Sequence, residues 1–156
     1  MNPFFNKRKI AGFVMAGILA VQSLAAVSAD VPDYVLPVSR TAVLSETFDE
    51  EANNYLVSSG TTVMSVSAGE VVKAEYKNEL GYHVAVENEA GEVFYYCFLQ
   101  RNLAVKEGDE VKAGDKLGIS GSAGLMSFKG RFKFFAEDAA GEGITETVLK
   151  RIYPAS

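Results

Sequence analysis

The chain is poor in the side chains that carry most metal and nucleophilic chemistry. Its 156 residues include one cysteine, Cys97, one histidine, His83, and no tryptophan. A single cysteine cannot form an intramolecular disulfide, and a single histidine without a second thiolate cannot form a zinc site of the usual His-rich kind. A Ser-His-Asp triad would have to use His83 itself. Disulfide scaffolds and His-rich zinc sites are therefore excluded.

The surroundings of these two residues predict structural roles. Cys97 stands among aromatic and apolar residues in the stretch 95–99 (Tyr-Tyr-Cys-Phe-Leu), which is typical of a small buried side chain rather than a reactive thiol. His83 lies in the alternating stretch 82–86 (Tyr-His-Val-Ala-Val), which favours a β-strand. We therefore interpret His83 as an ordinary packing or surface residue.

A cluster of basic residues stands near the N-terminus. Lys7, Arg8 and Lys9 precede an apolar run from Ile10 to about Val27, and small residues at 27–29 (Val-Ser-Ala) suit a signal peptidase. This pattern predicts a secretory signal peptide over residues 1–29. The run is near the lower length that spans a bilayer, so an uncleaved membrane anchor is the alternative.

The charge that remains after this segment limits the choice of partner. Removing residues 1–29 takes three basic residues and no acidic residue from a chain of net charge −5, which leaves −8. Nucleic acids and anionic lipids require clustered Lys and Arg. We therefore expect no nucleic acid partner, membrane attachment only through an uncleaved N-terminal segment, and a secreted, extracytoplasmic location in the cell envelope.

Short alternating stretches separated by glycine turns follow residue 34. Many strands at short spacing predict an all-β, sandwich-like fold with at most one short helix, Thr145–Ile152, started by Thr145. We expect one domain over residues 30–156, with its core at about 35–137, and an irregular polar segment at Phe48–Tyr55. The expected extended segments are Val35–Val38, Ala42–Leu44, Thr61–Ser67, Glu70–Tyr76, His83–Glu87, Glu92–Leu99, Glu110–Lys112, Lys116–Ile119 and Arg131–Ala136.

The most informative stretch is Val105–Gly118, where two Gly-Asp dipeptides enclose one short strand. Gly108 and Gly114 are expected to take positive φ where the chain reverses, and Val111 and Leu117 are expected to point into the core. This unit by itself also fits biotinyl or lipoyl carrier domains. A carrier-type barrel-sandwich domain is therefore one alternative.

The order of the neighbouring blocks resembles that of the M23 peptidases, the lysostaphin or LytM-like family. Residues 96–99 (Tyr-Cys-Phe-Leu) stand where the family has Tyr-x-His-Leu, and residues 131–134 (Arg-Phe-Lys-Phe) stand where it has His-x-His-Phe. The glycine-bounded strands at 60–71 and 81–88 also match. The resemblance implies the family's fold, a duplicated hybrid motif with a β-sandwich-like core.

The resemblance also implies where the family's metal site would lie. The zinc ligands, a His-x-x-x-Asp pair and the second histidine of His-x-His, fall at about Glu50, Asn54 and Lys133, and the two catalytic histidines fall at Phe98 and Arg131. A lysine ammonium cannot ligate zinc, a phenyl ring has no lone pair, and an asparagine amide is a poor ligand. We therefore expect no metal, no cofactor and no catalysis at these positions.

These positions favour a binding groove instead. Residues two apart on a strand share a face, so Arg131 and Lys133 should project into the former groove while Phe132 and Phe134 pack inward. The two cations could receive a carboxylate. The candidate groove residues are Arg131, Lys133, Glu50 and Tyr96. Tyr55, Tyr82 and Tyr95 are further candidates for aromatic walls, and half-buried sheet positions are the alternative for all four tyrosines.

A charged clip is one hypothesis for what replaces the metal. Glu50, with Glu51 or Asp49 nearby, would pair with Lys133, and a partly exposed pair of this kind contributes only about 0–1 kcal/mol. The alternative is that both cations of the groove are solvated.

Three functions follow from these observations. The first is an exported, non-catalytic module that binds a peptidoglycan stem peptide or an envelope protein, since degenerate relatives of the family activate cell-wall amidases or dock a membrane partner. The second is a peptidoglycan metalloendopeptidase whose ligands the alignment has misplaced. The third is the carrier-type domain, which would need a modified lysine such as Lys112 or Lys116.

Overall fold

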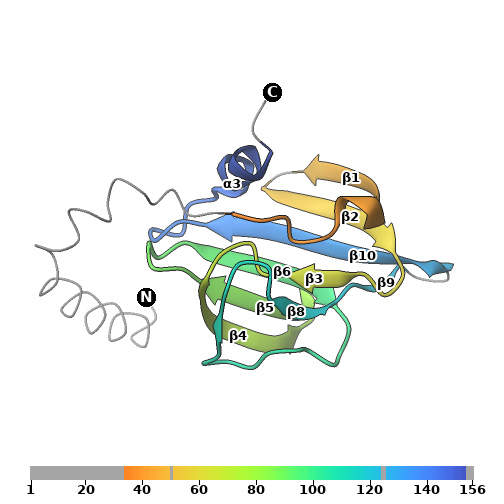
Figure 1. Cartoon of the computed structure of the whole chain (residues 1–156), viewed down its shortest axis with the longest axis horizontal. Coiled ribbons are helices and arrows are strands. Elements are labelled where there is room, and N and C mark those ends of the chain that lie inside the picture. Colours follow the sequence, from red (N-terminus) through yellow and green to blue (C-terminus); the bar gives the residue numbers. More distant parts are fainter. Residues whose placement is uncertain (1–33, 50, 124–125, 154–156) are drawn as a thin grey trace, which may run out of the picture. The chain divides into compact units, whose positions relative to one another are not determined.

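The computed structural model describes residues 34–49, 51–123 and 126–153, and the strands of this part form two sheets. Figure 1 shows the large, twisted sheet running through the domain. In spatial order its strands are β1 (Val43–Asp49), β2 (Ala52–Ser58), β10 (Met126–Glu137), β6 (Val93–Leu99), β5 (Gly81–Glu87), β4 (Gly69–Lys77) and β7 (Glu110–Val111), with β9 (Gly121–Ala123) paired to β10. The small sheet joins β3 (Thr62–Met64) to β8 (Lys116–Ile119), and helix α3 (Thr145–Ile152) follows β10.

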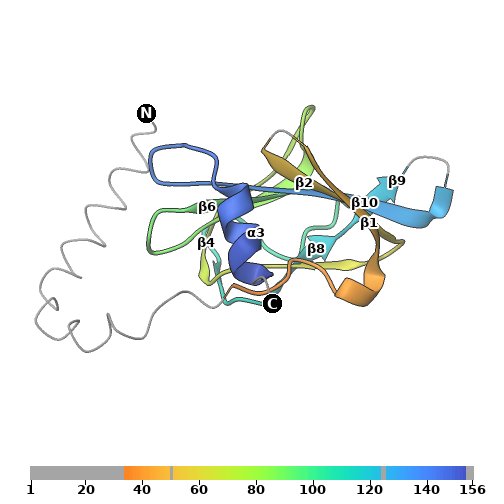
Figure 2. The same cartoon turned by 90° about the horizontal axis from the view of Figure 1, so that it is seen from above.

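The core lies on one face of the large sheet, which we call the inner face. Along β10, Phe132, Phe134 and Ala136 are almost fully buried in it, as strand alternation requires. Leu117 of β8 and Val148 of α3 belong to the same apolar cluster. Figure 2 shows α3 and β8 on the same side of the sheet. Burial of the aliphatic and aromatic side chains of this cluster contributes to the driving force for folding.

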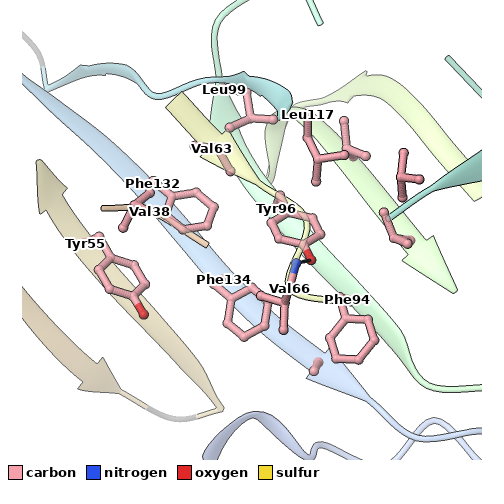
Figure 3. Close-up of a cluster of buried hydrophobic side chains, with 14 of the residues drawn as sticks. Val38, Tyr55, Val63, Val66, Phe94, Tyr96, Leu99, Leu117, Phe132 and Phe134 are labelled. Atoms are coloured by element: carbon pink, nitrogen blue, oxygen red, sulfur yellow. Dashed lines mark hydrogen bonds between the residues drawn. The ribbon is translucent and has the colours of Figure 1, made fainter. Parts of the chain in front are cut away.

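A hydrogen bond from the core fixes the segment that follows β3. The Tyr96 hydroxyl is fully buried and accepts the Val66 N–H at 2.8 Å, drawn as the dashed line in Figure 3. The backbone of Val35 donates to Val66, and that of Met64 donates to Pro37. The segment before β1 is therefore joined to the core by backbone hydrogen bonds, although it belongs to neither sheet.

The structure confirms the all-β fold and several details of the turns. The expected strands at 83–87 and 92–99 are present as β5 and β6, which pair antiparallel across the turn at 88–92. Gly108 and Gly114 have φ of 96° and 89°, and Val111 and Leu117 are buried. The helix has the predicted bounds.

Two local predictions are wrong. The segment Phe48–Tyr55 is not irregular, because β1 and β2 form an antiparallel hairpin whose second strand also pairs with β10. Tertiary pairing there outweighs the weak strand propensity of Asn53 and Asn54. Thr145 does not cap α3 either: Ile144 holds the N-cap position, and the Thr145 hydroxyl contacts the Ala136 N–H instead.

The remaining differences concern boundaries. Arg40–Ala42 is a short 3₁₀ helix, so the extended piece expected at Ala42–Leu44 begins at Val43 and runs on to Asp49. The segment expected to be extended at Val35–Val38 is not a sheet strand. The residues from Tyr34 onward form one compact unit, and within the described part of it no helix has the length and apolarity needed to cross a bilayer. The predicted signal peptide at 1–29 lies outside the described residues.

Candidate functional site

Three of the predicted positions, Asn54, Arg131 and Lys133, lie on the outer face of the large sheet, opposite the core. The pairing of β10 with β2 sets Lys133 directly opposite Asn54, and its pairing with β6 sets Lys133 opposite Cys97. Arg131 lies two residues along the same face, opposite Leu56. Side chains of directly opposed residues are in contact range, with Cβ atoms about 5 Å apart. The prediction that Arg131 and Lys133 share a face is therefore confirmed.

Arg131 stacks on a residue with an unusual backbone. Its guanidinium carbon lies 4.2 Å from the centre of the Phe98 ring, which is a cation–π geometry. Phe98 has a φ of 62°, a left-handed conformation that costs a non-glycine residue roughly 1–3 kcal/mol. Two glycines enclose it: a Cβ atom at Gly121 would lie 2.3 Å from the Phe98 carbonyl oxygen, and one at Gly81 would lie 3.2 Å from its ring.

The thiol and the imidazole of the chain lie beneath this face. Cys97 is fully buried, and burial raises the pKa of its thiol to about 12, against a smaller opposing effect of the Lys133 charge. His83 is also fully buried; its Nδ1 lies 3.2 Å from the Gly81 carbonyl oxygen and its Nε2 lies 3.8 Å from a Glu75 carboxylate oxygen. Both residues therefore have the packing roles predicted for them, and the thiol is not poised for nucleophilic chemistry.

The charged clip is only partly testable. Glu50 lies outside the described residues, so its pairing with Lys133 stays a prediction. Glu51 points elsewhere, because a Cβ atom at Gly143 would lie 2.7 Å from its carboxylate. Among the residues that the structure describes, no ion pair joins Lys133 to Asp49 or Glu51.

Tyr96 does not line the site. Its side chain is buried on the inner face, where its hydroxyl accepts the Val66 N–H. Tyr55 is likewise buried in the core, and Tyr82 packs against the core from its edge. Side chains alternate between the two faces along β6, so Tyr96 and Cys97 point to opposite faces. Because Cys97 lies on the outer face opposite Lys133, Tyr96 lies on the inner one. Of the four tyrosines considered, Tyr95 is the one that lies on the outer face, opposite Phe135.

Sequence reasoning missed two residues of this face, Phe135 and Glu137, which both contact Tyr95. The rings of Tyr95 and Phe135 stack with their centroids 4.4 Å apart and 8° between their planes. The Tyr95 hydroxyl donates to Glu137 at 3.4 Å, and burial, followed by the charges of Glu137 and Glu87, raises its pKa to about 12. The signal was present in the sequence, because Phe135 and Glu137 continue the every-second-residue pattern begun by Arg131 and Lys133.

The donor chemistry of the described part offers no alternative metal centre. Within residues 34–49, 51–123 and 126–153, no three His, Cys, Asp or Glu side chains come close enough together to hold a metal ion. Two hollows in the described part lie away from the outer-face cations. The larger one, of about 630 Å³, opens between β1 and α3 and includes Phe48, Asn53 and Tyr153.

Comparison with known proteins places this geometry in a family. The model for peptidase family M23 matches residues 50–136. A protein named "Uncharacterized metalloprotease" from Buchnera aphidicola is 31% identical over 68 residues, which cover 44% of this chain and 18% of that protein. The chain therefore spans less than a fifth of the length of this relative.

Two solved structures support the same fold. A putative M23 peptidase from Pseudomonas aeruginosa superimposes with a TM-score of 0.63 at 22% identity, over 91% of this chain and 62% of that one. Csd3 from Helicobacter pylori also gives a TM-score of 0.63 at 22% identity, over 78% of this chain and 33% of that one. At this level of identity, the likeness shows a shared fold.

Proposed function

The chain belongs to peptidase family M23, and from that premise we propose that it is an exported, non-catalytic member that binds a peptide component of the cell envelope through the outer face of its large sheet. One observation carries the proposal: the cation Lys133 lies directly opposite Asn54, where the family resemblance puts two zinc ligands. An ammonium and a carboxamide do not fit a zinc ion. Without the ion, there is nothing to activate water or polarise a scissile carbonyl.

The neighbouring pair supports the same conclusion. The resemblance puts the catalytic histidines at Phe98 and Arg131, and in this chain the two side chains stack on each other. Neither can exchange a proton near neutral pH, because a phenyl ring has no titratable group and a guanidinium stays protonated. Arg131 keeps its in-plane N–H donors while stacked, and such donors suit a carboxylate. The retained chemistry is therefore that of an anion receptor.

A metallopeptidase is the second candidate, because the Buchnera relative is named a metalloprotease. It would need ligands supplied from outside the described residues, Glu50 among them. The carrier alternative loses its main argument, because it rested on the Gly-Asp unit, and that unit lies within the region matched by the M23 model.

Metal analysis of the purified chain, combined with sedimentation on isolated cell walls, tests the proposal. We expect no stoichiometric zinc, no release of peptide fragments, and retention that falls when Lys133→Glu reverses the charge of the outer face. Lys112→Glu, an equal change on an exposed turn, should leave retention unchanged. Stoichiometric zinc with wall hydrolysis would restore the peptidase reading. Absence of both zinc and retention would rule out wall binding and leave a protein of the envelope as partner.

A further inference from the structure

The side chains on the outer side of β10 change in charge along the strand. Arg131, Lys133, Phe135 and Glu137 follow one another at every second position, so cations come first, an aromatic ring next and a carboxylate last. Alternate residues of a strand are about 6.7 Å apart. Lys133 and Glu137 are therefore separated by about 13 Å, and Arg131 and Glu137 by about 20 Å.

The positive end of this strip is held in place. Arg131 lies over the Phe98 ring, and the backbone of Phe98 is fixed by a hydrogen bond from its N–H to the Leu80 carbonyl. Lys133 is half-buried between its cross-strand partners Asn54 and Cys97. An arginine stacked on an aromatic ring loses less rotamer freedom when it binds a ligand than a free one does. This end is suited to a carboxylate.

An apolar shelf follows, formed by a pair of rings that cover one face of each other. The stacked rings of Tyr95 and Phe135 are both half-buried, so part of each ring remains open to solvent. A shelf of this kind accepts small apolar side chains without selecting strongly among them.

The negative end lies beyond the shelf. Glu137 lies opposite Val93, which in turn lies opposite Glu87, so the two carboxylates flank one strand. Both act on the Tyr95 phenol, whose hydroxyl contacts Glu137 at 3.4 Å. A carboxylate has acceptor capacity for several hydrogen bonds, so Glu137 can accept a further donor beside that of Tyr95. This end is suited to an ammonium group.

We propose that the outer face binds a short, extended peptide in a single orientation, with a carboxylate on Arg131 and Lys133, small side chains on the Tyr95–Phe135 shelf, and an ammonium group at Glu137. The proposal rests on the proposed function and specifies its ligand. An extended chain advances about 3.3 Å per residue, so a span of 13–20 Å corresponds to about four to six residues. A wholly acidic protein loop fits less well, because Glu137 and Glu87 would repel its far end.

Four end-capped forms of one neutral pentapeptide, Ala-Gly-Ala-Gly-Ala, test this directly. The forms have a free or acetylated amine combined with a free or amidated carboxyl terminus, and backbone amide NMR shifts of the full mature chain report both affinity and place. We expect the form with both ends free to bind best, and each cap to weaken binding about fivefold, which is the worth of a partly exposed charge pair. The shifts should follow β10 and β6.

Two charge-removing variants separate the ends. Glu137→Gln should abolish the effect of acetylation and keep the effect of amidation, whereas the double variant Arg131→Gln, Lys133→Gln should do the reverse. Glu107→Gln and Lys112→Gln, which change exposed charges elsewhere, should keep both effects, and thermal melting checks that every variant is folded.

The outcomes are distinct. If acetylation has no effect on the wild-type chain, or if the shifts map away from β10, the oriented peptide is refuted even where cell-wall retention and absence of zinc uphold the proposed function. If no form binds but walls still retain the chain, the peptide ligand is likewise refuted and the function survives. If the walls do not retain the chain and no form of the peptide binds, both the proposed function and the oriented peptide are refuted.

Discussion

The two faces of the large sheet differ in how their residues are used, although the same strands supply both. Along β10, Phe132 and Phe134 enter a core in which they are almost fully buried, while Arg131 and Lys133 point outward beside them. The inner face carries the residues that form the core, and the outer face carries Arg131 and Lys133, on which the proposed function rests. Because strand alternation separates the two faces, the residues of the outer face can change without changing the core.

The largest expected difference between the faces is in stability, and a cavity made in the inner face tests it. Phe134→Ala removes a fully buried ring from the aromatic cluster and should lower the free energy of unfolding by about 3–5 kcal/mol. Phe135→Ala, the neighbour on the outer face, should cost only about 1 kcal/mol, mainly through its stack with Tyr95. Urea unfolding of both variants measures the difference. Equal losses would mean that the outer face is also part of the core.

A single hydroxyl group gives a finer comparison. Tyr96→Phe leaves the buried Val66 N–H without its acceptor, which should cost about 1–3 kcal/mol. Tyr95→Phe removes a hydroxyl group from the other face, where the contact with Glu137 is long and partly solvated, and should cost less than about 0.5 kcal/mol. Chemical denaturation at neutral pH compares them. A larger loss for Tyr95→Phe would contradict the division between faces.

Alkaline pH probes the thiol that lies beneath Lys133. Burial raises the pKa of Cys97 from 9.0 to about 12. The stability linked to Cys97 is therefore fully present below pH 9 and is lost as pH rises towards 12, because only the unfolded thiol ionises in that window. We expect a Cys97-specific loss of about 2 kcal/mol between pH 8 and pH 10.5. Urea unfolding at both pH values gives the loss of unfolding free energy for the wild-type chain and for Cys97→Ala, and the Cys97-specific loss is the difference between the two.

The parts of the fold that sequence predicts well are those with a local cause. Gly108 and Gly114 mark turns that need positive φ, and the period of two in residues 131–134 assigns each side chain to a face. The hairpin at Phe48–Tyr55 was missed because its stability comes from β10, about 75 residues away along the chain. The Asn and Glu residues of this segment form no local pattern that would indicate a strand so distant in the sequence as its pairing partner.

The candidate site was predictable in part for the same reason. Alternation placed Arg131 and Lys133 together, but Tyr96 was misplaced because the resemblance gives an alignment and not the direction of a side chain. The stack of Arg131 on Phe98 needed the structure, since it depends on the left-handed backbone at Phe98 and on the close approach of Gly121. Neither feature has a sequence signature, because phenylalanine rarely adopts a positive φ.

The smallest expected change in stability comes from the contact between Arg131 and Phe98 on the outer face. Arg131→Gln should lower the free energy of unfolding by about 0.5–1 kcal/mol, the worth of an exposed cation–π contact, whereas Arg101→Gln, at an exposed arginine elsewhere, should change it by less than about 0.5 kcal/mol. A double-mutant cycle with Phe98→Leu isolates the contact, because the coupling energy vanishes if the two side chains act independently. Coupling of about 0.5–1 kcal/mol means that Phe98 holds the guanidinium in position for a ligand. A coupling energy near zero means that Arg131 is a solvated cation, and the preorganised positive end of the strip would then be refuted.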